Sequence, residues 1–207
     1  MYYSDKAIII SRRDFREDDL LVNCFALNYG KIGLQVKGAR KIKSKLNAHV
    51  DLFNLVELNW VAGKAGYKLI AVDEISAFKN IKNDYQRINQ AGYVVNLFNK
   101  LTHLYHPDKN LFYFLKSVLE KIDSCQLKEL PLVKLSFDYK LLFLLGYDPS
   151  QRNDLKAEEK QVIKKIIRLS VDEISKSNFK SQVLNNLYKK SKILLEEVLE
   201  KEVVRSW

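Results

Sequence analysis

The sequence predicts an α+β protein in which a five-stranded Greek-key β-barrel is followed by an all-α helical bundle. Five of the seven glycines lie in the first 66 residues, whereas all three prolines come after residue 100. The spacing of apolar residues also changes near residue 80, from the alternation of strands to the period of helices. We therefore expect two domains, the barrel in residues 1–79 and the helical domain in residues 80–207.

Five strand-like segments separated by turn residues make up the first domain. They span residues 6–10, 20–28, 34–37, 52–61 and 67–78. Gly30 and Gly33 bound the turn before the third segment, and Gly63 and Gly66 bound the hairpin turn before the fifth. Five short strands closed by turns suit a small barrel, which buries its interior and leaves no exposed sheet edge.

Five stripes of apolar residues at helical spacing make up the second domain. They lie within residues 85–99, 111–122, 132–145, 162–167 and 184–199. The first stripe ends before His106 and Pro107, and the third ends at Gly146 and the turn formed by Asp148 and Pro149. The sequence contains no internal repeat and no segment of low complexity.

Composition and cysteine content exclude several classes of protein. Hydrophobic residues make up 47% of the chain, which is ordinary for a globular protein with a buried core. No run of eighteen apolar residues exists, and the first residues lack the pattern of a signal peptide. The two cysteines, Cys24 and Cys125, are too few for a disulfide framework or a zinc ribbon. We expect a cytoplasmic protein with no membrane partner and no cofactor.

Signals of an enzyme are weak in this sequence. It lacks the G-x-S-x-G, Walker and G-x-G-x-x-G motifs. His103 and His106 share one helical face and Asp108 follows them, so a metal pair is conceivable, but histidines near a helix end more often cap free carbonyl groups. Cys24 fits a strand as a small apolar residue. We expect no catalytic residue, no metal site and no enzymatic activity.

Acidic residues gather just after the first expected strand. They are Asp14, Glu17, Asp18 and Asp19, and they lie beside Arg12, Arg13 and Arg16. Carboxylates of this kind can bind a cation, but the neighbouring arginines favour a solvated turn that neutralises its own charge.

The charge pattern points to a polyanionic partner. The chain carries 35 basic against 25 acidic side chains, a net charge of +10. Residues 31–45 contain no acidic residue and six basic ones, which we predict to bind DNA: Lys31, Lys37, Arg40, Lys41, Lys43 and Lys45. Gly38 and Ala39 give this loop a small, flexible approach to a phosphate backbone. The alternative is a solvated basic loop without a partner, but its position on a small barrel favours nucleic acid.

Aromatic residues of the barrel are candidates for stacking on nucleic-acid bases. They are Tyr2, Tyr3, Phe53, Trp60 and Tyr67. In so small a barrel most large aromatic side chains must belong to the core, so only some of them are expected at the surface.

Two sequence strings carry a resemblance to a known family. The first is Val36-Lys37-Gly38-Ala39-Arg40-Lys41 with Lys43-Ser44-Lys45-Leu46, preceded by the glycine turn Gly30-Lys31-Ile32. The second is Leu145-Gly146-Tyr147-Asp148-Pro149 at the end of the third helical stripe. Together with the order of elements over nearly the whole chain, these strings resemble the bacterial recombination mediator family RecO.

The resemblance implies an N-terminal OB-fold and a helical C-terminal domain. It also implies binding to single- and double-stranded DNA, annealing of complementary strands, and cooperation with RecR in loading RecA onto DNA coated by single-stranded-DNA-binding protein. The expected location is therefore the bacterial cytoplasm, in association with the nucleoid. Two rival functions remain open, a protein-binding scaffold and a barrel that binds structured RNA without annealing it.

The resemblance further implies that the helical half receives the acidic, phenylalanine-ending tail of single-stranded-DNA-binding protein. Such a tail needs an apolar slot and nearby cations. We predict these on the third helical stripe, at Leu132, Lys134, Leu135 and Lys140, against the alternative of core leucines and solvated lysines.

Two positions depart from the family pattern. Many members carry a four-cysteine zinc module after the L-G-Y-x-P turn, where this chain has Ser150-Gln151-Arg152-Asn153-Asp154. The helical domain is therefore expected to lack the zinc module. The position between Asp19 and Leu21 is often basic in the family and is Leu20 here, which removes one cation near the barrel.

Overall fold

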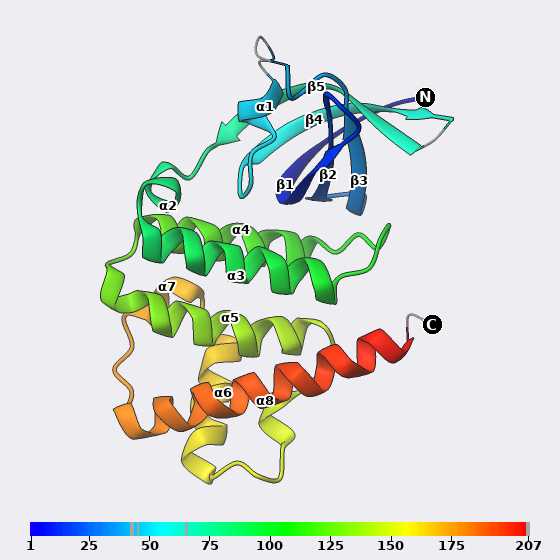
Figure 1. The fold of residues 1–207 in the computed structure, drawn as a ribbon. Coiled ribbons are helices and arrows are strands. Elements are labelled where there is room, and N and C mark those ends of the chain that lie inside the picture. The colour runs from blue at the N-terminus through cyan, green and yellow to red at the C-terminus, as the bar shows by residue number, and fades with distance from the viewer. Residues whose placement is uncertain (42–43, 45, 65, 206–207) are drawn as a thin grey trace. The chain divides into compact units, whose positions relative to one another are not determined.

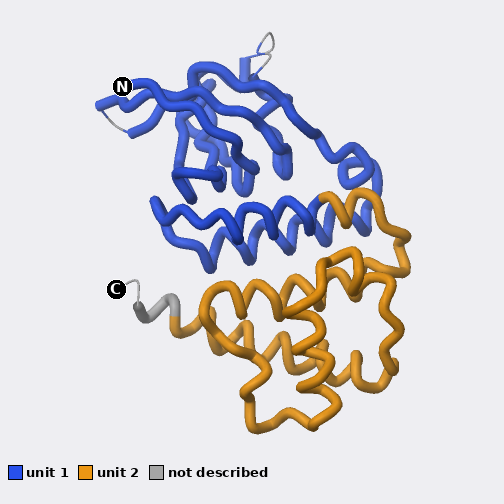
Figure 2. The backbone as a smooth tube through the Cα atoms, turned by 180° about the vertical axis from the view of Figure 1, so that it is seen from behind, with its two compact units in different colours: residues 1–119 blue, residues 120–207 orange. Residues whose placement is uncertain are grey.

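The computed structural model describes residues 1–41, 44, 46–64 and 66–205, with side chains described up to residue 201. The chain forms two compact units, Met1–Leu119 and Glu120–Trp207 (Figure 2). The first contains the barrel and two long helices, and the second contains the remaining helices. The predicted fold class, a five-stranded barrel followed by helices, is confirmed. The predicted domain boundary at residues 79 and 80 stays a prediction.

The barrel is closed in the order β1-β2-β3-β5-β4 (Figure 1). Its strands are β1 (Tyr2–Phe15), β2 (Asp19–Ala26), β3 (Gly30–Val36), β4 (Leu55–Gly63) and β5 (Gly66–Ser76). β1 is longer than the expected residues 6–10 because it pairs with two strands, with β4 from Tyr2 to Ile8 and with β2 from Ala7 to Phe15. Only two residue pairs, Leu34 with Tyr67 and Gln35 with Lys68, join β3 to β5 among the described residues.

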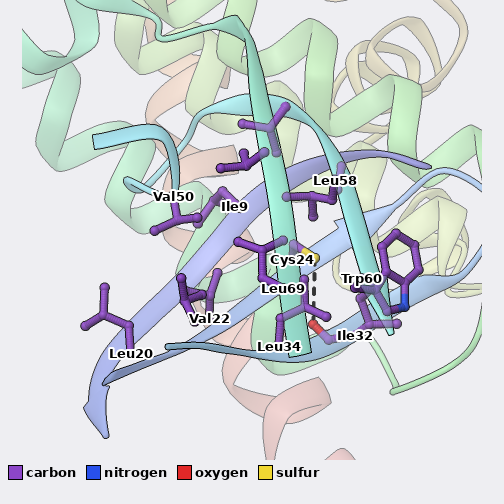
Figure 3. Packing of buried hydrophobic residues seen from close by; sticks show 14 of the residues in the cluster. Ile9, Leu20, Val22, Cys24, Ile32, Leu34, Val50, Leu58, Trp60 and Leu69 are labelled. Atoms are coloured by element: carbon purple, nitrogen blue, oxygen red, sulfur yellow. Dashed lines mark hydrogen bonds between the residues drawn. The ribbon is translucent and has the colours of Figure 1, made fainter. Parts of the chain in front are cut away.

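Alternate side chains of the strands fill the barrel (Figure 3). Trp60 is 1% exposed and is one of the largest buried side chains. Cys24 is fully buried and its thiol contacts the carbonyl oxygen of Ile32 at 3.8 Å. Burial raises the pKa of the Cys24 thiol far above its usual range, which agrees with its expected role as a small core residue.

The helices of the first unit lie around the barrel, and the two long ones lie together at one end of it (Figure 1). They are α1 (Leu46–His49), α2 (Lys79–Asn83), α3 (Tyr85–Leu101) and α4 (Lys109–Ser124), the last of which continues into the second unit. α3 begins where the Asp84 carboxylate accepts a hydrogen bond from the backbone N–H of Arg87. It packs on the barrel through Phe98, whose ring meets the ring of Phe25 edge to face at 4.9 Å.

The second unit is built from α5 (Leu130–Leu144), α6 (Ala157–Arg168), α7 (Val171–Ser175) and α8 (Ser181–Arg205). Two short 3-10 turns, Leu127–Glu129 and Pro149–Gln151, precede α5 and α6. The hydroxyl of the buried Tyr139 on α5 donates to the carbonyl oxygen of Leu187 on α8 at 3.0 Å. No helix in the described part of the chain is long and apolar enough to span a membrane.

Candidate nucleic-acid interface

The loop after β3 is fixed to the turn between β1 and β2. The carboxylate of Asp19 accepts the backbone N–H of Gly38 at 2.8 Å and the side-chain amide of Gln35 at 2.7 Å. The hydrogen bond from the Gly38 N–H lowers the pKa of Asp19, and the hydrogen bond from Gln35 adds to this effect. Together they outweigh desolvation, which would raise the pKa. The backbone N–H of Arg40 donates to the carbonyl oxygen of Asp18 at 2.9 Å. Gly38 has a φ of 63°, a left-handed conformation that favours glycine.

Three predicted DNA-binding cations, Lys37, Arg40 and Lys41, are exposed on this loop. Acidic side chains of the neighbouring turn approach two of them, at 3.4 Å for Arg40 with Asp14 and 3.8 Å for Lys41 with Asp18. Because these pairs are solvent-exposed, each contributes at most about 1 kcal/mol. The cations of the loop can therefore exchange these acidic side chains for the phosphates of a nucleic acid. Lys43 and Lys45 lie outside the described residues.

One arginine beside the acidic turn, Arg12, contacts residues outside that turn. The guanidinium of Arg12 binds the carboxylate of Asp51 at 2.9 Å and the side chain of Asn47 at 2.8 Å. Those partners are more than thirty residues away in sequence, so local spacing could not reveal them.

Lys31 belongs to a different place from the rest of the predicted DNA-binding set. It lies within β3, and its half-buried ammonium donates to the carbonyl oxygens of Asn99, at 2.7 Å, and Thr102. These carbonyl groups are at the end of α3, where a cation is favoured by the helix dipole. Burial lowers the pKa of Lys31. Its charge holds α3 to the barrel, and its ammonium is not displayed on the loop.

Small and polar residues occupy the outer face of β2 and β3. Asn23, Gly33 and Gln35 alternate with the buried core residues of these strands. A Cβ atom on Gly33 would lie 3.2 Å from the Asn23 side-chain oxygen, so glycine keeps this face shallow. The face leads from the basic loop at one end of β3 to the turn between β2 and β3 at the other.

Stacking candidates from the sequence divide into core and surface residues. Phe53 and Trp60 are 4% and 1% exposed, so both are core. Tyr3 and Tyr67 are half-buried, and Tyr2 is exposed. The structure adds two exposed tyrosines that our sequence analysis missed, Tyr29 at 39% and Tyr105 at 59%.

The predicted tail-binding residues on α5 do not form an open slot. Leu135 is fully buried, and Leu132 packs against the same core. Lys134 donates to the buried Asp138 carboxylate at 2.8 Å. Lys140 donates to the carbonyl oxygen of Leu169 at 2.7 Å, and burial lowers its pKa.

A pocket of about 770 Å³ lies elsewhere in the second unit, between α6 and the start of α8. Phe179 and three aliphatic side chains form its apolar part, and its cations are Lys164, Lys165, Arg168 and Lys180. The Lys165 ammonium lies 5.9 Å from the centroid of the Phe179 ring. The pocket offers an apolar surface with cations around it, the combination expected on α5. One carboxylate, that of Glu158, also lines it and pairs with Lys180 at 2.8 Å.

The two histidines considered as a metal pair lie on the loop between α3 and α4. The rings of His103 and His106 are 6.1 Å apart and both side chains are exposed. Across the described residues, no three His, Cys, Asp or Glu side chains are grouped so as to hold a metal ion.

Comparison with known proteins gives the family. Residues 1–80 match the family described as "Recombination protein O N terminal", and residues 82–201 match "Recombination protein O C terminal". The chain belongs to the RecO family. The resemblance seen in the sequence strings is thereby confirmed.

Similar RecO proteins come from several bacteria. The chain is 30% identical to "DNA repair protein RecO" of Thermoanaerobacter sp. (strain X514), over 72% of this chain and 59% of that protein. It is also 30% identical to "DNA repair protein RecO" of Geobacter metallireducens, over 69% of this chain and 57% of that protein. The matched region thus spans less than two thirds of the length of these RecO relatives.

Proposed function

We propose that this chain is a DNA-binding recombination mediator that acts in DNA repair without a catalytic group. It binds single- and double-stranded DNA, anneals complementary strands and, with RecR, helps to load RecA onto DNA coated by single-stranded-DNA-binding protein. Membership of the RecO family supports this role. The observation that carries it is the basic loop after β3, which is fixed by Asp19 and exposes Lys37, Arg40 and Lys41.

Annealing requires two polyanionic strands to approach one another closely. Lysine and arginine side chains reduce the repulsion when they replace condensed counterions on the phosphates. Within the loop, the backbone at Gly38 and Arg40 is already held by Asp19 and Asp18, so little ordering of this part is needed when nucleic acid binds. Asp14 and Asp18 contact two loop cations and must be exchanged for phosphates, which keeps the interaction reversible.

We expect the double substitution Lys37→Glu/Lys41→Glu to lower affinity for single-stranded DNA about 30- to 100-fold near 0.1 M salt. The slope of log affinity against log salt should also fall by about 0.7 for each phosphate that is no longer neutralised. The matched control is Lys189→Glu/Lys192→Glu, which changes the net charge equally at exposed positions of α8. Equal reductions in affinity in both variants would contradict a site on the loop.

An annealing assay tests the proposed function itself. Complementary strands coated with single-stranded-DNA-binding protein are mixed with the wild-type chain or with either double variant. Faster annealing with the wild type and with the α8 control, but not with the loop variant, is the expected result. Equal binding to RNA strands, or no acceleration by any protein, would favour the RNA-binding or scaffold function instead.

A second, protein-binding function is favoured by the pocket between α6 and α8. We propose that it receives the acidic, phenylalanine-ending tail of single-stranded-DNA-binding protein, with the ring on the apolar part and the carboxylates on the cations. Lys164 and Arg168 are exposed on the rim and are available to carboxylates. The α5 residues Leu132, Lys134, Leu135 and Lys140 are the alternative location.

We expect Lys164→Ala/Arg168→Ala to weaken binding of a labelled tail peptide to the full chain about tenfold, because the substitutions remove two charge-assisted hydrogen-bond donors. Lys134→Gln, which can still donate to Asp138, should leave peptide affinity unchanged. Binding is measured by fluorescence anisotropy at two salt concentrations. Loss of binding in Lys134→Gln alone would place the peptide on α5.

A further inference from the structure

Four tyrosines from distant parts of the sequence form a series of ring contacts that begins at Trp60. The Tyr3 ring stacks on the Trp60 ring with centroids 5.6 Å apart and planes at 11°. Tyr29 meets both rings edge to face, at 5.6 Å from Tyr3 and 5.2 Å from Trp60. Tyr67 meets Tyr3 at 5.7 Å, and Tyr105 meets Tyr67 at 6.2 Å. We call Tyr3, Tyr29, Tyr67 and Tyr105 the tyrosine cluster.

Side chains of the tyrosine cluster are more exposed to solvent than those of the barrel core. Trp60 is nearly inaccessible, whereas Tyr29 is 39% and Tyr105 is 59% exposed. An exposed group of large aromatic side chains usually marks a binding surface. Tyrosine also suits a binding surface that is exposed to water before its ligand binds, because its hydroxyl group can hydrogen-bond to water while its ring offers a stacking face.

A backbone hydrogen bond, together with the ring contact to Tyr67, holds Tyr105 in this position. Its φ of 60° is left-handed, which is unfavourable for a tyrosine. Its N–H donates to the carbonyl oxygen of Lys31 at 3.0 Å, and the Lys31 ammonium holds the end of α3. Strain of this kind persists where the surroundings impose it, and it often accompanies a binding site. The exposed ring is thus pre-organised.

The charges around the tyrosine cluster complement a phosphate backbone. Lys64 and Lys68 lie on the β4–β5 hairpin beside Tyr67, with Lys64 exposed and Lys68 half-buried. Two carboxylates of this region accept hydrogen bonds from neighbouring amide groups. Asp5 accepts the backbone N–H of Asn28 at 2.6 Å and its side-chain amide at 2.9 Å, and Asp108 accepts two backbone N–H groups at the start of α4.

We propose that the tyrosine cluster stacks unpaired bases of a single nucleic-acid strand whose phosphates contact the basic loop. This inference rests on the proposed DNA-binding function. β3 connects the two places, since Tyr29 precedes it and Lys37 follows it. Its 7 residues span about 23 Å, a length that fits within the 4–16 nucleotides bound by single OB-folds. Stacking tolerates every base, which suits an annealing protein.

The test separates stacking on bases from contacts to phosphates. Affinity is measured for an oligothymidine of about 16 nucleotides and for an abasic oligonucleotide with the same number of phosphates. Tyr29→Leu/Tyr105→Leu keeps apolar bulk but removes two stacking faces. We expect this variant to bind oligothymidine about tenfold more weakly for each ring removed, with unchanged abasic affinity and salt slope. Tyr85→Leu is the control, because Tyr85 is 80% exposed at the start of α3, outside the cluster.

A cross-linking experiment on the wild-type chain tests the same site without depending on the folding of a variant. An oligonucleotide carrying 5-iododeoxyuridine is irradiated on the protein, and the modified peptides are identified by mass spectrometry. Adducts on Tyr29 or Tyr105, and none on Tyr85, are expected. Equal wild-type affinity for the two oligonucleotides, or adducts confined to Tyr85, would overturn the stacking site while leaving phosphate binding intact. If neither oligonucleotide binds, it is the proposed DNA-binding function that fails.

Discussion

Replacing Gly30 with alanine is expected to lower the free energy of unfolding of the barrel unit by about 3–5 kcal/mol. Gly30 has a φ of 67°, which costs about 1–2 kcal/mol in a residue with a Cβ atom. The added Cβ would also overlap the carbonyl oxygen of His106 and lie 2.7 Å from the nitrogen of Pro107. These are backbone atoms of a loop that the Tyr105 N–H holds to Lys31, so they cannot move aside cheaply.

Gly38→Ala is the matched control for this prediction. Gly38 has nearly the same φ, 63°, but a Cβ there would meet only the flexible Lys41 side chain, at 3.6 Å. The destabilisation should therefore be the conformational part alone, about 1–2 kcal/mol. Urea unfolding of both variants gives the comparison. Equal destabilisation by Gly30→Ala and Gly38→Ala would contradict the prediction, because it would show that the loop before α4 can move away from the added Cβ atom at little cost.

Replacing Glu159 with alanine is expected to destabilise the helical unit by about 2–4 kcal/mol. Glu159 is 2% exposed, and its carboxylate accepts from the Lys190 ammonium at 2.8 Å and the Asn186 amide at 3.2 Å. It also accepts the backbone N–H of Lys156 at 2.9 Å, which caps α6. Its removal takes one acceptor from each of three donors, of which Lys190 keeps the carbonyl oxygen of Asp154. Glu158→Ala, which breaks the exposed pair with Lys180, should cost less than about 1 kcal/mol.

The same carboxylate makes the helical unit sensitive to acid. Burial would raise the pKa of Glu159, but the hydrogen bonds from Lys190, Lys156 and Asn186 outweigh it and lower the pKa from its ordinary 4.5. A lowered folded-state pKa stabilises the protein fully above the unfolded-state value, and that stabilisation disappears as pH falls through the folded-state value. The difference in unfolding free energy between wild type and Glu159→Gln should therefore shrink below about pH 4.5. A constant difference from pH 7 to pH 3 would contradict this linkage.

The fold was largely predictable because it follows from local patterns. Alternating apolar residues located the five strands, and the helical period located the long helices of the described chain. The turn predicted at residues 30–33 was wrong, because these residues pair with β2 and form the first half of β3. The length of β1 was missed, because polar residues such as Arg12 and Arg13 pair with β2 outside the apolar run. The short helices α1 and α7 were missed because four or five residues carry too little periodicity.

The candidate site was predictable only in its local part. The charge run correctly located a loop with exposed Lys37 and Lys41. The role of Lys31 depends on carbonyl groups about seventy residues away, and its local charge gave no sign of them. The tyrosine cluster likewise comes from four segments that meet only when the barrel closes, so no spacing in the sequence joins Tyr29 to Tyr105. The pocket beside α6 forms between segments that are polar in sequence, where only Phe179 stood out as large and apolar.

The narrow join between β3 and β5 has a dynamic consequence for the barrel. Among the described residues two pairs close it, against nine between β4 and β5, so local opening there breaks few hydrogen bonds. Tyr67 and Lys68 also pair with Ala62 and Val61 of β4, and successive N–H groups of a strand point to opposite neighbours, so only one of these two amides can point to β3. We expect that amide to exchange with solvent deuterium through local opening, and the amides in the middle of β1 and β4 to exchange mainly through global unfolding. Because β3 runs into the basic loop and Tyr67 belongs to the tyrosine cluster, a nucleic acid bound to both, as proposed, would hold this join shut. Binding of the nucleic acid should then slow amide exchange at the β3–β5 join, even if the nucleic acid does not contact the backbone there.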